Sequence, residues 1–94
     1  MKTYEEIQAM SIGEITEELY RLGAFINYIK SECVGTLLIV EYQGWLTWNI
    51  AFSKKEAFEF ALDDVYYTKE EIESGREQPF NINEYGRRKD GKKR

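Results

Sequence analysis

Apolar and polar positions alternate through the middle of the chain, and they repeat with a helical spacing on either side of it. Residues 36–42 and 45–52 are rich in β-branched and aromatic side chains, and Gln43-Gly44 lies between them. A two-residue loop with glycine is typical of a β-hairpin, because glycine accepts the positive φ that such turns need. The pattern therefore predicts two antiparallel strands in which Tyr42 lies opposite Trp45.

Each predicted strand presents its side chains to two faces in turn. In this register one face is nearly all apolar and carries Leu37, Ile39, Leu46, Trp48, Ile50 and Phe52. We predict that this face belongs to the core. The opposite face is mixed and consists of Leu38, Val40, Tyr42, Trp45, Thr47, Asn49 and Ala51. If neither residues 79–85 nor a helix covers that face, Tyr42 and Trp45 form an exposed aromatic patch. A slip of one residue would exchange the two faces.

Helix starts are marked by four capping boxes, in which Ser or Thr precedes Glu by three residues. The pairs are Thr3 with Glu6, Ser11 with Glu14, Ser53 with Glu56, and Thr68 with Glu71. We predict helices over about residues 4–10, 12–31 and 53–67, and a fourth from residue 68 to Ser74-Gly75. The second helix carries an apolar stripe spaced by three and four residues, made of Ile12, Ile15, Leu19, Leu22, Ile26 and Ile29. This stripe is expected to face the core, and any part left uncovered could support a homodimer.

The fold predicted from these elements is α+β, a small single domain. An antiparallel hairpin, with three strands as the alternative, has its helices packed on one face, in the order α-α-β-β-α-α. Residues 79–85 alternate weakly behind Pro79 and could add an edge strand or an ordered arm.

Length, charge and composition narrow the functional classes. The chain has 94 residues, which is the size of one domain. Its net charge of −4 combines −9 over residues 1–86 with +5 over residues 87–94. We therefore predict an acidic domain over 1–86, followed by a flexible basic tail over 87–94.

Catalytic chemistry finds little support in the sequence. The chain has no His and a single Cys, which excludes a His-based triad, a His zinc site and an internal disulfide. Cys33 follows Glu32, whose charge opposes thiolate formation. No phosphate-binding loop is present. We expect a non-enzymatic protein with no catalytic residue, metal or cofactor.

The N-terminal residues have no apolar segment typical of a secretory signal, and the longest apolar run covers only residues 37–40. A cytoplasmic protein without membrane contact is the resulting expectation.

The leading functional hypothesis is a protein-binding module. Tyr42 and Trp45 would anchor the partner, since Tyr and Trp are favoured at interfaces. A row of carboxylates would select a basic partner surface, namely Glu56, Glu59, Asp63 and Asp64. Such a row can imitate the phosphates of nucleic acid, although a solvated helix face is the plainer interpretation. In size and composition the chain resembles small acidic inhibitors carried by phages and other mobile elements. The resemblance implies an inhibitor of a larger nucleic-acid-handling protein.

The alternative hypothesis is a nucleic-acid-associated accessory protein that uses the basic tail. The tail residues that would neutralise phosphates are Arg87, Arg88, Lys89, Lys92, Lys93 and Arg94. The same residues could also keep the chain in solution or fold back on the acidic domain.

Overall fold

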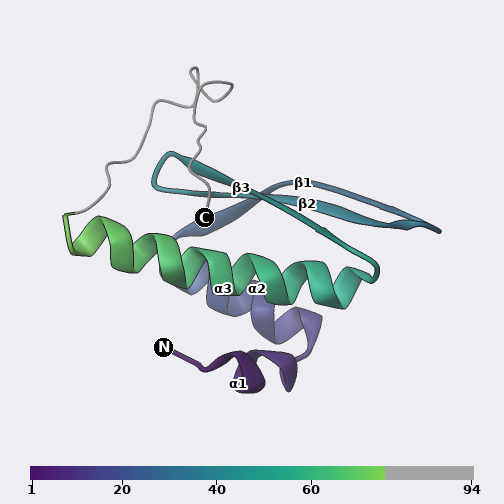
Figure 1. Ribbon diagram of the computed structural model, residues 1–94, viewed down its shortest axis with the longest axis horizontal. Coiled ribbons are helices and arrows are strands. Elements are labelled where there is room, and N and C mark those ends of the chain that lie inside the picture. Colours follow the sequence, from purple (N-terminus) through teal and green to yellow (C-terminus); the bar gives the residue numbers. More distant parts are fainter. Residues whose placement is uncertain (76–94) are drawn as a thin grey trace.

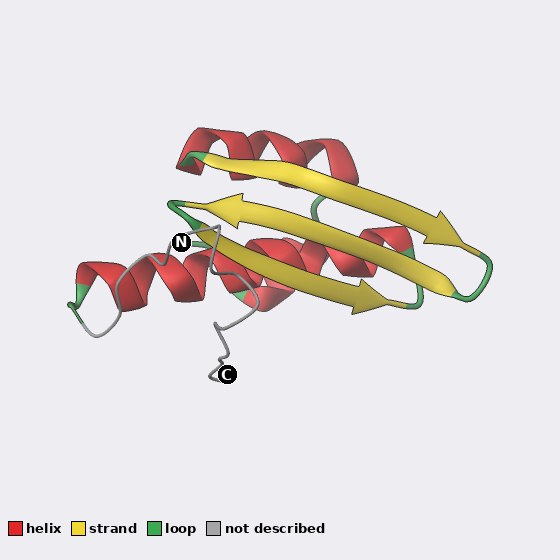
Figure 2. Ribbon diagram, turned by 90° about the horizontal axis from the view of Figure 1, so that it is seen from above, coloured by secondary structure: helices red, strands yellow, loops and turns green. Residues whose placement is uncertain are grey.

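The computed structural model describes residues 1–75, which form three helices and one antiparallel sheet. The elements follow the order α1 (Tyr4–Gln8), α2 (Ile12–Leu22), β1 (Ala24–Glu32), β2 (Gly35–Tyr42), β3 (Trp45–Ala51) and α3 (Lys54–Glu73). The strands form a sheet in the order β1-β2-β3, and all three helices lie on one side of it (Figures 1 and 2). The predicted α+β fold with helices on one face is confirmed. The predicted tail, the end of the domain at residue 86 and the possible strand over 79–85 lie outside the described residues.

The first two capping boxes form as predicted. The Thr3 hydroxyl accepts from the Glu6 amide at 3.2 Å, and the Glu6 carboxylate accepts from the Thr3 amide at 2.9 Å. Ser11 and Glu14 repeat this exchange at the start of α2. These caps satisfy backbone N–H groups that have no partner within the helix.

The predicted second helix was wrong beyond Leu22. Gly23 ends α2 in the left-handed region, at φ +93°, and the chain turns there directly into β1. The helical spacing of Ile26 and Ile29 misled the interpretation, because both residues lie in the strand. The third strand therefore exists, but it precedes the hairpin.

The hairpin between β2 and β3 has the predicted register. Tyr42 lies opposite Trp45, and the Gln43-Gly44 turn takes positive φ at both residues. Strand β1 pairs with β2, and a bulge at Asn27 shifts this register between Ile26 and Tyr28. The turn between β1 and β2 projects beyond the helices (Figure 2).

Helix α3 is a single helix, so the predicted break at Thr68 was wrong. Its first cap forms in part, with the Ser53 hydroxyl accepting from the Glu56 amide at 3.1 Å. Thr68 lies inside the helix with its side chain buried. The helix ends at Ser74, next to Gly75, as expected from the glycine.

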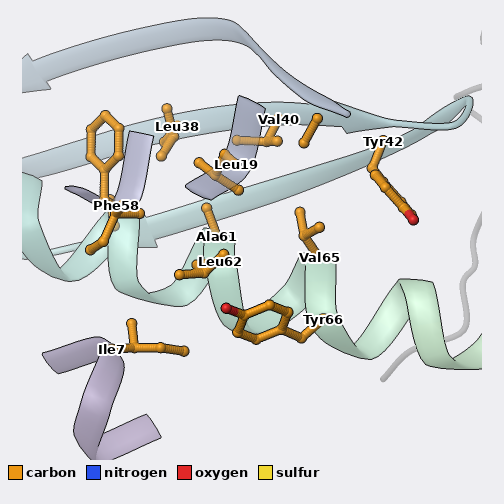
Figure 3. Packing of buried hydrophobic residues seen from close by; sticks show 13 residues of the cluster. Ile7, Leu19, Leu38, Val40, Tyr42, Phe58, Ala61, Leu62, Val65 and Tyr66 are labelled. Carbon is orange, nitrogen blue, oxygen red and sulfur yellow. The ribbon is translucent and has the colours of Figure 1, made fainter. Parts of the chain in front are cut away.

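The core lies between the helices and one face of the sheet (Figure 3). Leu38 and Val40 point from β2 toward α3, which contributes its own apolar side chains. Helix α2 packs against both α3 and β1, and α1 packs against α3. The main members besides Leu38 and Val40 are Ile7, Ile15, Leu19, Tyr42, Phe58, Ala61, Leu62, Val65 and Tyr66. We call this side of the sheet the inner face.

The predicted choice of core face was wrong, because the helices cover the mixed face. The inner face contains Thr36, Thr47 and Asn49, all with less than 5% of their surface exposed. Their polar atoms are satisfied locally. Thr47 donates to the Val40 carbonyl oxygen at 3.3 Å, and Asn49 donates to the Leu38 carbonyl oxygen at 3.4 Å. Since a buried polar group is costly only when it lacks a partner, these residues are tolerated in the core.

A polar cluster joins α2 to α3. The Glu18 carboxylate accepts two hydrogen bonds from the Arg21 guanidinium, at 2.9 and 2.7 Å, and one from the Tyr66 hydroxyl at 2.8 Å. The hydrogen bonds from Arg21 are the largest cause that lowers the pKa of Glu18, to about 2. Burial and the Glu18 carboxylate raise the pKa of Tyr66 to about 12.

We predict that this cluster makes folding sensitive to acid. Above about pH 5 Glu18 is ionised in both the folded and the unfolded chain, so its contribution is complete. As the pH falls toward 2 the unfolded chain takes up the proton first, and the contribution is lost. Glu18→Gln should therefore lower the free energy of unfolding by about 2 kcal/mol near neutral pH, a value discounted for the exposed Arg21. Urea unfolding of both chains should show this difference vanishing near pH 2, and a difference that does not depend on pH would contradict it.

A second prediction concerns the end of α2. Gly23→Ala should lower the free energy of unfolding by about 1 kcal/mol, because a Cβ is strained at this positive φ. Gly13→Ala is the matched control within the same helix. A Cβ there would meet only the Ser11 hydroxyl at 3.9 Å, so this change should raise stability by about 0.5 kcal/mol. If urea unfolding shows that both substitutions change the free energy of unfolding in the same direction, the assigned end of α2 is wrong.

Candidate protein-binding surface

The structure places Tyr42 and Trp45 in the core. Their exposed fractions are 3% and 5%, and both side chains lie on the inner face. Burial raises the pKa of the Tyr42 hydroxyl, which accepts a hydrogen bond from the Gln43 amide at 3.2 Å. The expectation that these two aromatic residues form an exposed patch was therefore wrong, because α3 covers the face that carries them.

The four predicted acidic residues do not form one exposed row. Glu59 is buried and is paired with Lys55, whose ammonium group also donates to the Gln8 carbonyl oxygen at 2.7 Å. Glu59 thus takes part in holding α3 against α1. Asp64 is half-buried, which leaves Glu56 and Asp63 exposed.

The acidic residues of α3 lie close enough to α1 to affect the pKa of its Tyr4. Burial raises the pKa of Tyr4, and the carboxylates of Glu59, Asp63 and Glu56 raise it further. The Tyr4 ring stacks on Phe60 with centroids 6.5 Å apart. Among residues 1–75, no group of three acidic or Cys side chains is arranged to hold a metal ion.

The structure reveals a different candidate surface on the side of the sheet that faces away from the helices. We call it the outer face. Its apolar members are Phe25 and Tyr28 from β1, Leu37 and Ile39 from β2, and Leu46, Trp48 and Ile50 from β3. No helix of the described chain covers these side chains (Figure 2).

The most exposed side chains of the outer face lie on β1 and β3, while Leu37 and Ile39 on the central strand are half-buried. Ile50 is 72% exposed, Phe25 60%, Trp48 49% and Tyr28 47%. The register joins these residues into rows across the sheet, such as Tyr28 beside Ile39 and Ile39 beside Trp48. An apolar surface of this extent on a small chain is typical of an interaction site.

Charged groups lie at the two ends of the outer face. Lys30 stands beside Leu37 near the β1–β2 turn and pairs with Glu32 at 3.2 Å. Glu41 stands beside Phe25 at the other end and accepts a hydrogen bond from the Asn27 amide at 3.0 Å. The side chains between them are uncharged. At the β1 edge, Phe25 also contacts Tyr20 of α2, with ring centroids 6.3 Å apart.

The acidic side chains are concentrated on the helices. Of the fourteen acidic residues among residues 1–75, only Glu32 and Glu41 lie in the sheet. The predicted site combined aromatic and acidic side chains on one surface, but the structure separates acidic and apolar surfaces onto opposite layers.

The sequence contained the signal for the outer face. Five of its members were recognised as the most apolar face of the hairpin but were assigned to the core. Phe25 and Tyr28 were missed altogether, because β1 was interpreted as helix.

A shallow groove lies beside α2. It is lined by both cations and carboxylates, namely Lys2, Glu14, Glu17, Glu18 and Arg21, together with Met10. Arg21 is already engaged by Glu18, which accepts two hydrogen bonds from its guanidinium group. Catalytic chemistry gains no support from it.

Searches with this chain find no matching family model, curated protein or solved structure. Within residues 1–75, no helix has the length and apolar character that crossing a bilayer requires.

We predict that substitutions on the two faces of the sheet lower stability by different amounts. Tyr42→Ala should lower the free energy of unfolding by about 3 kcal/mol, because it opens a cavity in the core. Trp48→Ala should lower it by less than about 1 kcal/mol, because this side chain is half exposed. Trp45 stays in both variants and reports unfolding by its fluorescence. Unfolding of both variants is measured at low protein concentration, so that association between chains does not contribute to the result. The reverse order of effects would contradict the assignment of the inner face.

Proposed function

We propose that the chain is a non-enzymatic protein-binding module and that the outer face is its binding surface. One observation carries the proposal: the outer face leaves large aromatic and aliphatic side chains exposed, namely Phe25, Tyr28, Trp48 and Ile50, while the helices cover the inner face with its Thr36, Thr47 and Asn49. Burial of apolar side chains is the main driving force of folding. A chain that leaves Trp48 and Ile50 exposed, while burying Thr47 and Asn49, therefore has a surface suited to burial by another protein.

The composition of the outer face supports a protein partner over a nucleic acid. Its aromatic side chains could stack on bases, but binding of nucleic acid also needs cations along the backbone path. Lys30 is the only cation in the three strands, and Glu32 neutralises it. Trp and Tyr within an apolar surface are typical anchors of protein interfaces.

The acidic helices give a second, weaker element of selection. Exposed carboxylates such as Glu56 and Asp63 would speed association with a basic surface and steer its orientation. The expectation that the target is a nucleic-acid-handling protein, which an acidic inhibitor would block, rests on this charge alone and stays a prediction. The alternative of nucleic-acid binding through residues 87–94 lies outside the described residues and also stays a prediction.

The proposal can be tested by comparing two variants with the same change in charge. Ile50→Lys adds a charge to the outer face, and Glu70→Gln removes one from the exposed surface of α3. Tagged wild-type and variant chains are used to capture proteins from lysate of the source cells at high salt, with nuclease present. Captured candidates are then purified, and their affinity is measured directly.

We expect a partner that binds the wild-type chain and Glu70→Gln equally and binds Ile50→Lys at least about 30-fold more weakly, as for loss of an interface anchor. Binding should persist at high salt, because burial of apolar surface is not screened. A partner lost with Glu70→Gln but retained with Ile50→Lys would overturn the proposal. A partner that is recovered when nuclease is omitted but lost when it is added would favour the nucleic-acid alternative.

A further inference from the structure

We infer that the partner of the outer face is a second copy of this chain, packed face to face with its strands antiparallel to those of the first. The inference rests on the proposed function, because it names the occupant of the same surface. Three features support it: the extent of the face, the position of its charges and the location of the acidic helices.

The outer face supplies most of the area that a stable dimer needs. A large aromatic side chain buries roughly 150–250 Å² when fully covered. Given the exposed fractions of Phe25, Tyr28, Trp48 and Ile50, the face offers on the order of 600 Å² of surface per copy, once its half-buried members are included. A stable interface buries about 800 Å² per partner, so the outer face covers roughly three quarters of that area and surface next to it would supply the rest.

The charges make the face complementary to itself. Lys30 lies in the row of Leu37 and Ile50 and forms an exposed ion pair with Glu32 beyond that row, which it would have to share with or exchange for a partner carboxylate, while Glu41 lies in the row of Phe25 and Leu46. The uncharged row of Tyr28, Ile39 and Trp48 lies between them. A two-fold axis that crosses the strands at this middle row brings the Lys30 row of each copy onto the Glu41 row of the other.

The resulting contacts are favourable for both charged groups. Lys30 would lie over the partner copy's Phe25 and beside its Glu41, which combines a cation–π contact with an ion pair. Both contacts occur twice, as two-fold symmetry requires. With the strands parallel instead, Glu41 on the central strand would meet the partner copy's Glu41, and Lys30 would lie over the partner copy's Ile50.

The acidic helices permit this arrangement because they lie on the far side of each sheet. Packed sheets are separated by about 10 Å, and each helical layer adds roughly a further layer spacing. The two acidic layers would then be several Debye lengths apart at physiological ionic strength, where the Debye length is about 8 Å. A different protein with a basic surface would find little complementary charge on the outer face itself.

Sedimentation of the full chain tests the dimer. The wild-type chain and Glu70→Gln should sediment at twice the mass of 11.1 kDa, and Ile50→Lys should sediment as a monomer with its dissociation constant raised at least about 30-fold. Circular dichroism checks that Ile50→Lys remains folded, as its exposed position predicts. Lys30→Glu and Glu41→Lys should each weaken the dimer, and the two changes together should restore it.

The single cysteine tests the orientation without any substitution. Cys33 is exposed in the turn between β1 and β2, at one end of the sheet. A spin label on Cys33 should report a separation of roughly 35–40 Å in the antiparallel dimer, from the rise of about 3.3 Å per residue along each strand. Parallel strands would place the labels within roughly 20 Å of each other and would overturn the orientation.

The remaining outcomes separate this inference from the proposed function. A wild-type chain that stays monomeric at high concentration overturns the dimer. If Ile50→Lys nevertheless loses a captured protein, the outer face belongs to that protein and the proposed function stands. If Ile50→Lys instead makes residues 76–94 more sensitive to protease in the monomer, the face belongs to the chain's own C-terminal segment. A dimer that Ile50→Lys leaves intact uses another surface and also overturns the inference.

Discussion

The packing of α3 across the inner face of the sheet is the constraint on which the rest of the structure depends. Leu38 and Val40 meet Ala61, Leu62 and Val65 there, and this contact decides which face of the sheet is enclosed. Helix α1 is then held on the far side of α3 through Lys55, and α2 through Tyr66 and Glu18. With all three helices on one side, the outer face is left to solvent or to a partner.

Local signals in the sequence were sufficient for most of the elements. Two complete capping boxes and the Gln43-Gly44 turn act within a few residues, and the structure forms them as predicted. The boundary at Gly23 was missed because Ile26 and Ile29 happen to continue a helical spacing into a strand. Their neighbours Phe25 and Tyr28 favour a strand, and glycine at the end of α2 was the available sign of the boundary.

The candidate site could not be located in the same way, because the identity of the buried face is a tertiary property. Counting apolar residues favoured the side with Leu37, Ile39 and Trp48, and this preference assumes that the most apolar face is always enclosed. The assumption fails here, because the helices cover the other face of the sheet. Asn49 and Thr47 can be buried because their own neighbouring carbonyl oxygens satisfy them, a detail that requires the folded sheet.

The bulge at Asn27 has a consequence for how far sheets of this kind can extend. An edge strand that accepts a neighbour along its whole length can join one sheet to the next without limit, and such growth leads to fibrils. In β1 the extra residue interrupts the regular spacing of backbone groups along that edge. Open-ended growth needs two accepting edges on every copy. With the β1 edge interrupted at Asn27, regular pairing of a further strand along the whole of that edge is disfavoured, which works against open-ended joining of sheets.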